Sequence, residues 1–88
     1  EQAVTYWMKA GELLDGQGWV RMSMDAYRRA LAIAGGDAER CRALIGLAGG
    51  MRIVDAYEDA FQALDEAQAL AEGEGLTGEL ARIHYLRG

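Results

Sequence analysis

Apolar residues recur along this chain at the three-and-four spacing of an amphipathic helix. The spacing is clearest in two segments, 19–34 and 55–72, whose opposite faces carry charged side chains. The expected buried faces are Val20, Ser23, Met24, Tyr27, Ala30, Leu31 and Ala34 in the first segment, and Tyr57, Ala60, Phe61, Leu64, Ala67, Gln68 and Ala71 in the second. No strand pattern competes with this periodicity. The sequence therefore predicts an all-α protein.

Clusters of glycine divide the helical pattern. They are Gly16–Gly18, Gly35–Gly36, Gly49–Gly50 and Gly73–Gly75. Glycine tolerates left-handed backbone and costs about 1 kcal/mol inside a helix. The predicted helices are therefore 2–15, 19–34, 38–49, 55–72 and 77–87. Asp37, Asp55 and Thr77 are expected to cap the last three through their side-chain oxygens. The short connections favour antiparallel neighbours.

The chain resembles itself when it is shifted by 37 residues. Seven positions keep their size class at this offset: Trp7 and Leu44, Ala10 and Leu47, Gly11 and Ala48, Leu14 and Met51, Ser23 and Ala60, Tyr27 and Leu64, and Ala30 and Ala67. The small residues let two helices approach closely, and the large ones fill the gaps beside them. A helix pair of this kind cannot bury its apolar face alone, so we expect the units to stack.

This pattern resembles the tetratricopeptide repeat, which combines Trp-x2-Leu-Gly-x2-Tyr with Ala-x3-Phe-x2-Ala in about 34 residues. Gln17-Gly18 at the turn and Arg29-Ala30-Leu31 near the end of the second helix are also familiar in that family. The resemblance covers residues 4 to 74. It implies a right-handed array of antiparallel helix hairpins, an α-solenoid fragment. The single domain, 1–88, would hold unit one at 4–37, unit two at 41–74 and a half unit at 77–88.

The chain also departs from the family pattern. The offset of 37 is longer than the usual period, and Gly35–Gly36 stands where the family often has proline. Longer periods resemble the divergent repeats of large bacterial regulators and of signalling ATPases or cyclases. Another α-helical repeat or bundle is the alternative fold. Under the repeat interpretation the mostly buried residues are Trp7, Gly11, Tyr27, Ala30, Leu44, Leu47, Ala48, Ala60, Leu64 and Ala67.

The last predicted helix, 77–87, resembles the first helix of a third unit. Either Ala81 or His84 would take the place of Trp7 there. Its apolar residues, Leu80, Ile83, Tyr85 and Leu86, spread around much of the helix. We expect this helix to contact the segment 55–72 on one side. The other side would carry an apolar strip, covered by a following helix or by self-association.

Composition excludes several kinds of chemistry. A net charge of −5 lacks the basic footprint of a nucleic-acid-binding protein, and no apolar run approaches the roughly 18 residues of a membrane span. The single Cys41 fits a reducing, cytoplasmic location.

Cys41 and His84 have no third group to orient them for catalysis. They are interpreted as packing residues, Cys41 at a helix start and His84 at a seam between helices. Gly46, Gly49 and Gly50 lack a phosphate-loop context and indicate close helix contact and a turn. No catalytic residue, metal or cofactor is predicted.

The resemblance implies that the first helices of the units line a concave face, where their outward residues meet a partner. These residues are Thr5, Met8, Glu12 and Asp15 in unit one, Arg42, Ile45 and Arg52 in unit two, and Arg82 in the last helix. An acidic peptide could lie across the three arginines, because a guanidinium matches a carboxylate in shape and charge. A solvated charged face is the alternative interpretation.

Two functions are compatible with this sequence. The first is a non-catalytic scaffold that binds a peptide or a protein domain in its concave groove. The second is a regulatory segment of a multidomain bacterial ATPase, cyclase or transcription regulator, which would act by intramolecular coupling.

Overall fold

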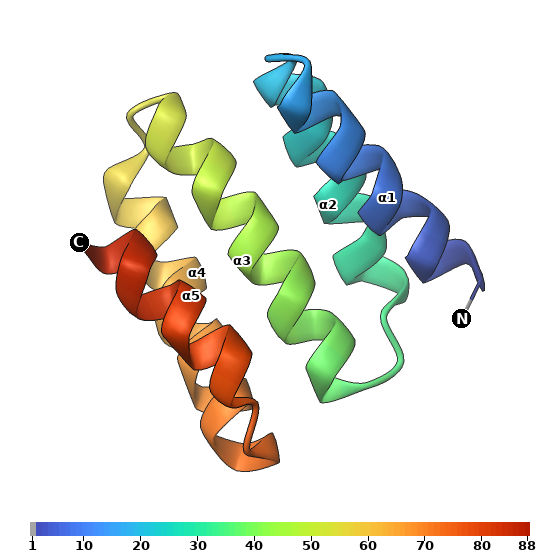
Figure 1. Cartoon of the computed structure of the whole chain (residues 1–88). Coiled ribbons are helices and arrows are strands. Elements are labelled where there is room, and N and C mark those ends of the chain that lie inside the picture. Colours follow the sequence, from blue (N-terminus) through green and yellow to red (C-terminus); the bar gives the residue numbers. More distant parts are fainter. Residues whose placement is uncertain (1) are drawn as a thin grey trace.

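The computed structural model describes residues 2–88, which form five α-helices and no strand. The helices are α1 (Gln2–Gly16), α2 (Val20–Ile33), α3 (Asp37–Ile53), α4 (Tyr57–Glu74) and α5 (Thr77–Arg87). Short loops connect them, so that consecutive helices run back and forth beside one another (Figure 1). The all-α prediction is confirmed for these residues.

α3 is the centre of the arrangement. Each helix packs against the next one in the chain, and α3 also contacts α1 and α5, so that it touches all four other helices. Among residues 2–88, α2 and α4 do not contact each other. α2 and α4 lie in one layer, and α1, α3 and α5 lie in the other, where α3 contacts both α1 and α5 (Figure 1). We call the side lined by these three helices the inner face.

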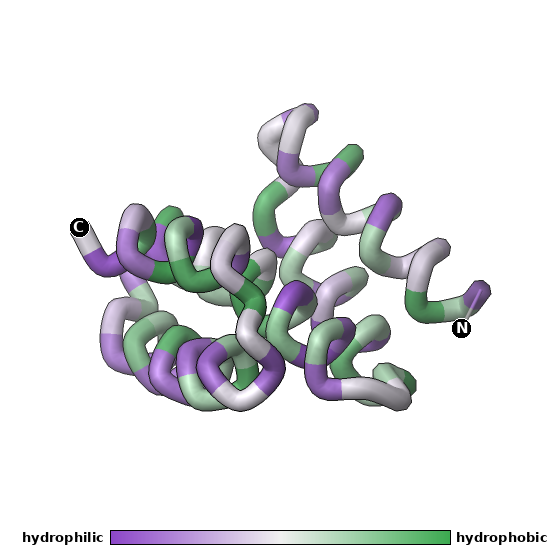
Figure 2. The backbone as a smooth tube through the Cα atoms, turned by 60° about the horizontal axis from the view of Figure 1, so that its bottom comes forward, coloured by the Kyte–Doolittle hydropathy of each residue, from purple (hydrophilic) through white to green (hydrophobic). Residues whose placement is uncertain are grey.

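The buried core follows the predicted pattern of small and large residues. Of the ten residues expected to be mostly buried, all except Trp7 are buried, and Trp7 is half-buried. The largest cluster joins α3 and α4 around Leu64 and includes Ile83 of α5. Hydrophobic and hydrophilic residues are interspersed along the helices (Figure 2). The central helix α3 buries residues around much of its circumference, because the other four helices pack against it.

One aromatic side chain joins the first three helices. The Tyr27 ring, from α2, lies between the backbones of Gly11 in α1 and Gly46 in α3: an added Cβ would stand 2.8 Å from Cζ at Gly11 and 2.5 Å from Cε1 at Gly46. Beside it, Ser23 Oγ donates a 2.7 Å hydrogen bond to the carbonyl oxygen of Gly11. Glycine at these two positions is therefore explained by contact with the ring rather than by a turn.

The predicted end of the third helix is wrong. α3 continues through Gly49 and Gly50 to Ile53. Gly50 is retained inside the helix because it packs against Met24, whose Sδ would lie 3.1 Å from an added Cβ. The chain turns instead at Asp55, whose φ of 66° lies in the left-handed region.

The predicted helix caps are also wrong. The residues before α3, α4 and α5 are Gly36, Ala56 and Leu76, and none of them makes a side-chain cap bond. Asp37 and Thr77 already lie within their helices, and Asp55 precedes the cap position of α4. The Asp55 carboxylate accepts a 3.0 Å hydrogen bond from the Tyr57 hydroxyl, so it is used in the turn.

Two aromatic residues expected on the buried side of α4 lie in solvent. Tyr57 is 52% exposed and Phe61 is 47% exposed. The small residues Ala60, Ala63 and Ala67 occupy the contact with the core instead. The helix can then approach α3 closely, and the rings have no room at that contact.

α5 contacts α4, as predicted, and also α3. Ile83 is fully buried, and Leu80 and Leu86 pack against the same core. Neither Ala81 nor His84 takes the buried position predicted for one of them, because both side chains are exposed. Tyr85 is 82% exposed on the outer side of the helix.

Ion pairs hold both ends of α5. Arg42 of α3 donates from Nε to Glu79 at 2.8 Å near the start of α5, and Arg87 near its end donates to Asp65 of α4. The hydrogen bond from Arg42 lowers the pKa of Glu79 below its ordinary value of 4.5.

Candidate functional site

Two hollows on the inner face contain the residues predicted to meet a partner. The larger one, which we call the central cleft, has a volume of about 430 Å³ and is walled mainly by α3 and α5, with contributions from Asp15 and Tyr27. The smaller one, the N-terminal hollow, has a volume of about 270 Å³ and lies between α1 and α3. The central cleft falls within the range of about 300–1,000 Å³ that is common for ligand sites.

All eight residues predicted to meet a partner line these two hollows. Thr5, Met8, Glu12 and Arg42 line the N-terminal hollow, and Asp15, Ile45, Arg52 and Arg82 line the central cleft. The predicted residues of each helix line the same side of the molecule because positions three and four apart share one face of a helix. Ile45 is only 1% exposed, so it forms the floor and not an outward contact.

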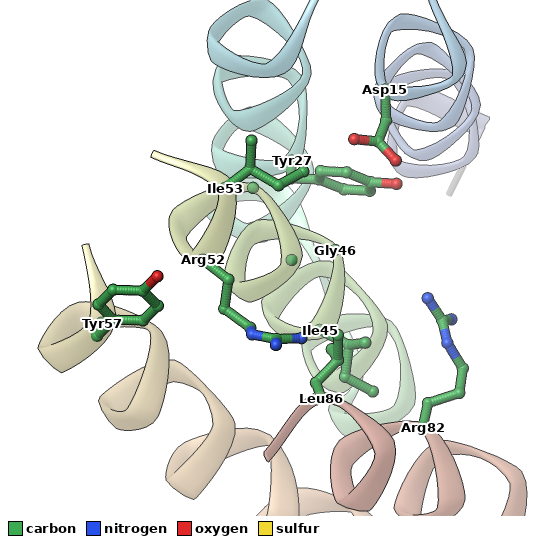
Figure 3. A pocket seen from close by; sticks show the side chains of 11 residues that line it. Asp15, Tyr27, Ile45, Gly46, Arg52, Ile53, Tyr57, Arg82 and Leu86 are labelled. Carbon is green, nitrogen blue, oxygen red and sulfur yellow. The ribbon is translucent and has the colours of Figure 1, made fainter. Parts of the chain in front are cut away.

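The three predicted arginines are not equivalent. Arg42 is paired with Glu79, so it is not part of a free ladder of guanidinium groups. Within residues 2–88, Arg52 and Arg82 form no ion pair. Figure 3 shows their side chains extending into the central cleft from α3 and α5, with Ile45 and Leu86 between them. The cationic part of the site is therefore this pair.

The Tyr27 hydroxyl is a site group that the sequence analysis treated only as core. Its ring is buried, but the side chain also lines the central cleft, with its oxygen on the side of Asp15 (Figure 3). Burial raises the pKa of this phenol above 10.0, Glu12 and Asp15 raise it further, and Arg82 opposes them. The hydroxyl is thus protonated at neutral pH and can donate a hydrogen bond.

Glycines of α3 line one side of the central cleft. Gly46, Gly49 and Gly50 lie there, and an added Cβ at Gly49 would have nothing within 4 Å. The close helix contact expected of these glycines is found at Gly46 and Gly50, whereas the turn expected at Gly49–Gly50 is absent. The space beside Gly46 and Gly50 is occupied by Tyr27 and Met24, so that the helix backbone is open to an approaching group only at Gly49.

The remaining candidates for chemistry are dispersed. Cys41 is buried, with Sγ 3.4 Å from the carbonyl oxygen of Ala67, and burial raises its pKa. His84 is exposed and not at the helix seam expected for it. Within residues 2–88, no three His, Cys, Asp or Glu residues are grouped as metal ligands would be. None of the described helices is both long enough and apolar enough to span a bilayer.

Comparison of the chain with protein-family models, with curated proteins and with solved structures found no match.

Proposed function

We propose that this chain is a tetratricopeptide-like segment that acts as a non-catalytic scaffold and binds an extended peptide along its inner face. The observation that carries the proposal is the pair of unpaired arginines, Arg52 and Arg82, in an open cleft on that face. Charged groups without a protein partner can be satisfied by a ligand, and guanidinium groups bind carboxylates well.

The pattern of contacts between the helices supports the repeat assignment. Successive hairpins stack through α3, and the inner helices contact one another while α2 and α4 do not, which is the arrangement expected of a curved helical array. The ion pair between Arg42 and Glu79 joins α3 to α5, the helix that would begin the next unit. A cytoplasmic location belongs to the same proposal.

The test is selection of peptide ligands followed by blocking of the cleft. A random peptide library displayed on phage is panned against the immobilised protein, and the recovered peptides are synthesised and titrated. Gly49→Trp places a large side chain in the cleft at a position where a Cβ meets nothing. Gly73→Trp is the matched control, because Gly73 is also helical and open but lies in α4, away from the cleft.

The expected result is that recovered peptides bind the wild type and Gly73→Trp equally and lose at least about tenfold in affinity with Gly49→Trp, a difference of about 1.4 kcal/mol. Circular dichroism checks that both variants stay helical. If the tryptophan disturbs folding, Gly49→Gln replaces Gly49→Trp as the variant that blocks the cleft. Failure to recover any peptide, or binding that ignores the blocked cleft, refutes the proposal.

A further inference from the structure

The lining of the central cleft is cationic, although the chain as a whole is acidic. The cleft is lined by the guanidinium groups of Arg52 and Arg82 and by the single carboxylate of Asp15, whereas the net charge of the chain is −5. Both arginines are exposed, and neither forms an ion pair within the described residues. The cleft therefore favours an anionic group locally, because charges farther away than about 8 Å are largely screened at physiological salt.

The two arginines stand apart, with apolar side chains between them. Arg52 extends from α3 on one side of Ile45 and Leu86, and the α5 arginine, Arg82, extends on the other side (Figure 3). Ile45 is buried and forms the floor, and Leu86 is half-buried beside it. Gly49 leaves open space next to this floor, because an added Cβ there would meet nothing. The cleft thus presents two cationic positions and one apolar position between them.

Asp15 lies outside this row of groups. Its carboxylate is beside the Tyr27 hydroxyl and away from Ile45 and Leu86 (Figure 3). Asp15 raises the pKa of Tyr27 and Arg82 lowers it, so both charges act on the same side of the cleft. The two charges do not form an ion pair within the described residues. A carboxylate bound at Arg82 is therefore repelled by Asp15, and removing that charge should strengthen its binding.

We infer that the partner segment presents two acidic side chains on either side of one aliphatic residue, with one carboxylate at each arginine of the cleft and the aliphatic side chain over the apolar floor between them. This inference rests on the proposed function and specifies its partner. A guanidinium group binds a carboxylate through paired hydrogen bonds. The aliphatic residue covers apolar surface there without taking a polar group out of water. Arg42 does not extend the row, because Glu79 already neutralises it.

Synthetic peptides with blocked, neutral termini test this pattern. The probes are fluorescein-labelled and carry Glu, Leu and Glu, separated by alanine and glycine spacers of varied length. Matched versions carry Gln in place of one or both Glu residues, or Ser in place of Leu. In fluorescence polarisation, each replacement of Glu by Gln in the best-binding peptide should weaken binding about three- to fivefold, and the effect should shrink as salt rises. Replacement of Leu by Ser should weaken it about fivefold or more.

Variants of the two arginines show whether each one holds a carboxylate. In Arg52→Gln and in Arg82→Gln, the peptide with two Glu residues should lose the affinity gained from its second Glu, because only one guanidinium group is left. Arg21→Gln is the matched control. Arg21 is an exposed arginine of α2 that forms no ion pair within the described residues and lies outside both hollows. The gain should persist in this control, although its net charge changes by the same amount.

Removal of the repelling carboxylate gives the opposite sign. Asp15→Asn should bind the doubly acidic peptide about threefold more tightly than the wild type. Glu74→Gln changes the net charge equally at an exposed position at the end of α4, outside both hollows, and should leave the affinity nearly unchanged. Equal effects within either matched set of variants would show that only the overall charge matters and would overturn the inference.

The outcomes separate this inference from the proposed function. If the peptides with Glu bind no better than those with Gln, while phage-selected peptides bind and Gly49→Trp blocks them, the inference fails and the scaffold function stands. If the second Glu adds as much affinity in the Arg52 and Arg82 variants as in the wild type, the carboxylates bind elsewhere and the inference is overturned. If neither the synthetic nor the phage-selected peptides bind, the inference and the proposed function both fail.

Discussion

Two glycines in the same helix should respond in opposite directions to the same substitution. Gly46 and Gly49 both lie well inside α3, so alanine at either position removes the entropic cost of a helical glycine. That gain is about 0.5–1 kcal/mol. If local helix propensity decided the outcome, both variants would be stabilised. The surroundings of the two residues predict otherwise.

The difference comes from Tyr27. An alanine Cβ at Gly46 would stand 2.5 Å from Cε1 of its ring, and the ring cannot move away because Gly11 contacts its other side. Overpacking of this kind costs about 1–3 kcal/mol. A contact this short with a confined ring belongs to the upper end of that range, so with the propensity gain subtracted Gly46→Ala is expected to destabilise the fold by about 2 kcal/mol. At Gly49 a Cβ meets nothing within 4 Å, so Gly49→Ala should stabilise it by about 0.5–1 kcal/mol.

Urea unfolding followed by far-ultraviolet circular dichroism measures both effects. Thermal unfolding provides a second measurement: for a chain of this size each 1 kcal/mol shifts the melting temperature by about 4–8 °C, so a difference of about 2.5–3 kcal/mol should separate the two variants by roughly 10–24 °C. Tyr27→Leu provides the check, since the cost of Gly46→Ala should fall when the ring is absent. Stabilisation of both variants, or an unchanged cost without the ring, would refute the reasoning.

Three further predictions follow from the same packing and charge contacts. Ala67→Trp should destabilise the fold by at least about 1–3 kcal/mol in urea titrations, because Ala67 is fully buried between helices; an unchanged midpoint would contradict the helix contact. Glu79→Gln should cost about 0.5–1 kcal/mol at neutral pH by removing the partner of Arg42. Since the folded-state pKa of Glu79 is lowered, that cost should be fully present above pH 4.5 and disappear as the pH falls below it; a cost that does not change with pH would count against the pairing. Cys41 should resist iodoacetamide in the native protein and react in urea, as followed by mass spectrometry, because its thiol is buried and its pKa raised; rapid native labelling would disprove this burial.

The sequence predicted the helical hairpins and most of the core because both depend on the spacing of small and large residues. Tyr27 and Leu64, matched by the 37-residue offset, are both buried, and so are Ala30 and Ala67. Such pairs are visible in the sequence because close contact between two helices needs small residues where the backbones approach and large ones beside them.

Local rules failed where tertiary contacts decide the conformation. Glycine is a helix breaker by propensity, yet Gly50 is helical because Met24 needs the space of a missing side chain. Asp55 was expected at a cap because of its side chain, but it takes the left-handed turn position before the helix instead. Neither outcome can be deduced from one segment without its neighbours.

The sequence analysis named the residues of the candidate site, but it did not predict which of their charged groups form ion pairs. Asp15, Arg52 and Arg82, which the sequence analysis assigned to one face, line the central cleft. The pairing of Arg42 was missed because the register of the last helix was left open. The offset of 37 does not supply that register, because it places the buried Leu44 and Ala48 on the exposed Ala81 and Tyr85. The role of the Tyr27 hydroxyl could not be predicted, since the same pattern that buries a ring says nothing about where its oxygen emerges.

The position of Tyr27 ties together two surfaces that face away from each other. Its backbone belongs to α2, on the outer side of the array, while its ring separates α1 from α3 and its hydroxyl opens on the central cleft. The ring is therefore confined between the backbones of Gly11 and Gly46, while its two ends reach α2 and the cleft. A ligand that pressed on the hydroxyl end would have to spread α1 and α3 or turn α2. The ring held between the two glycine backbones thus also sets how closely α1 and α3 approach each other and where α2 sits against them.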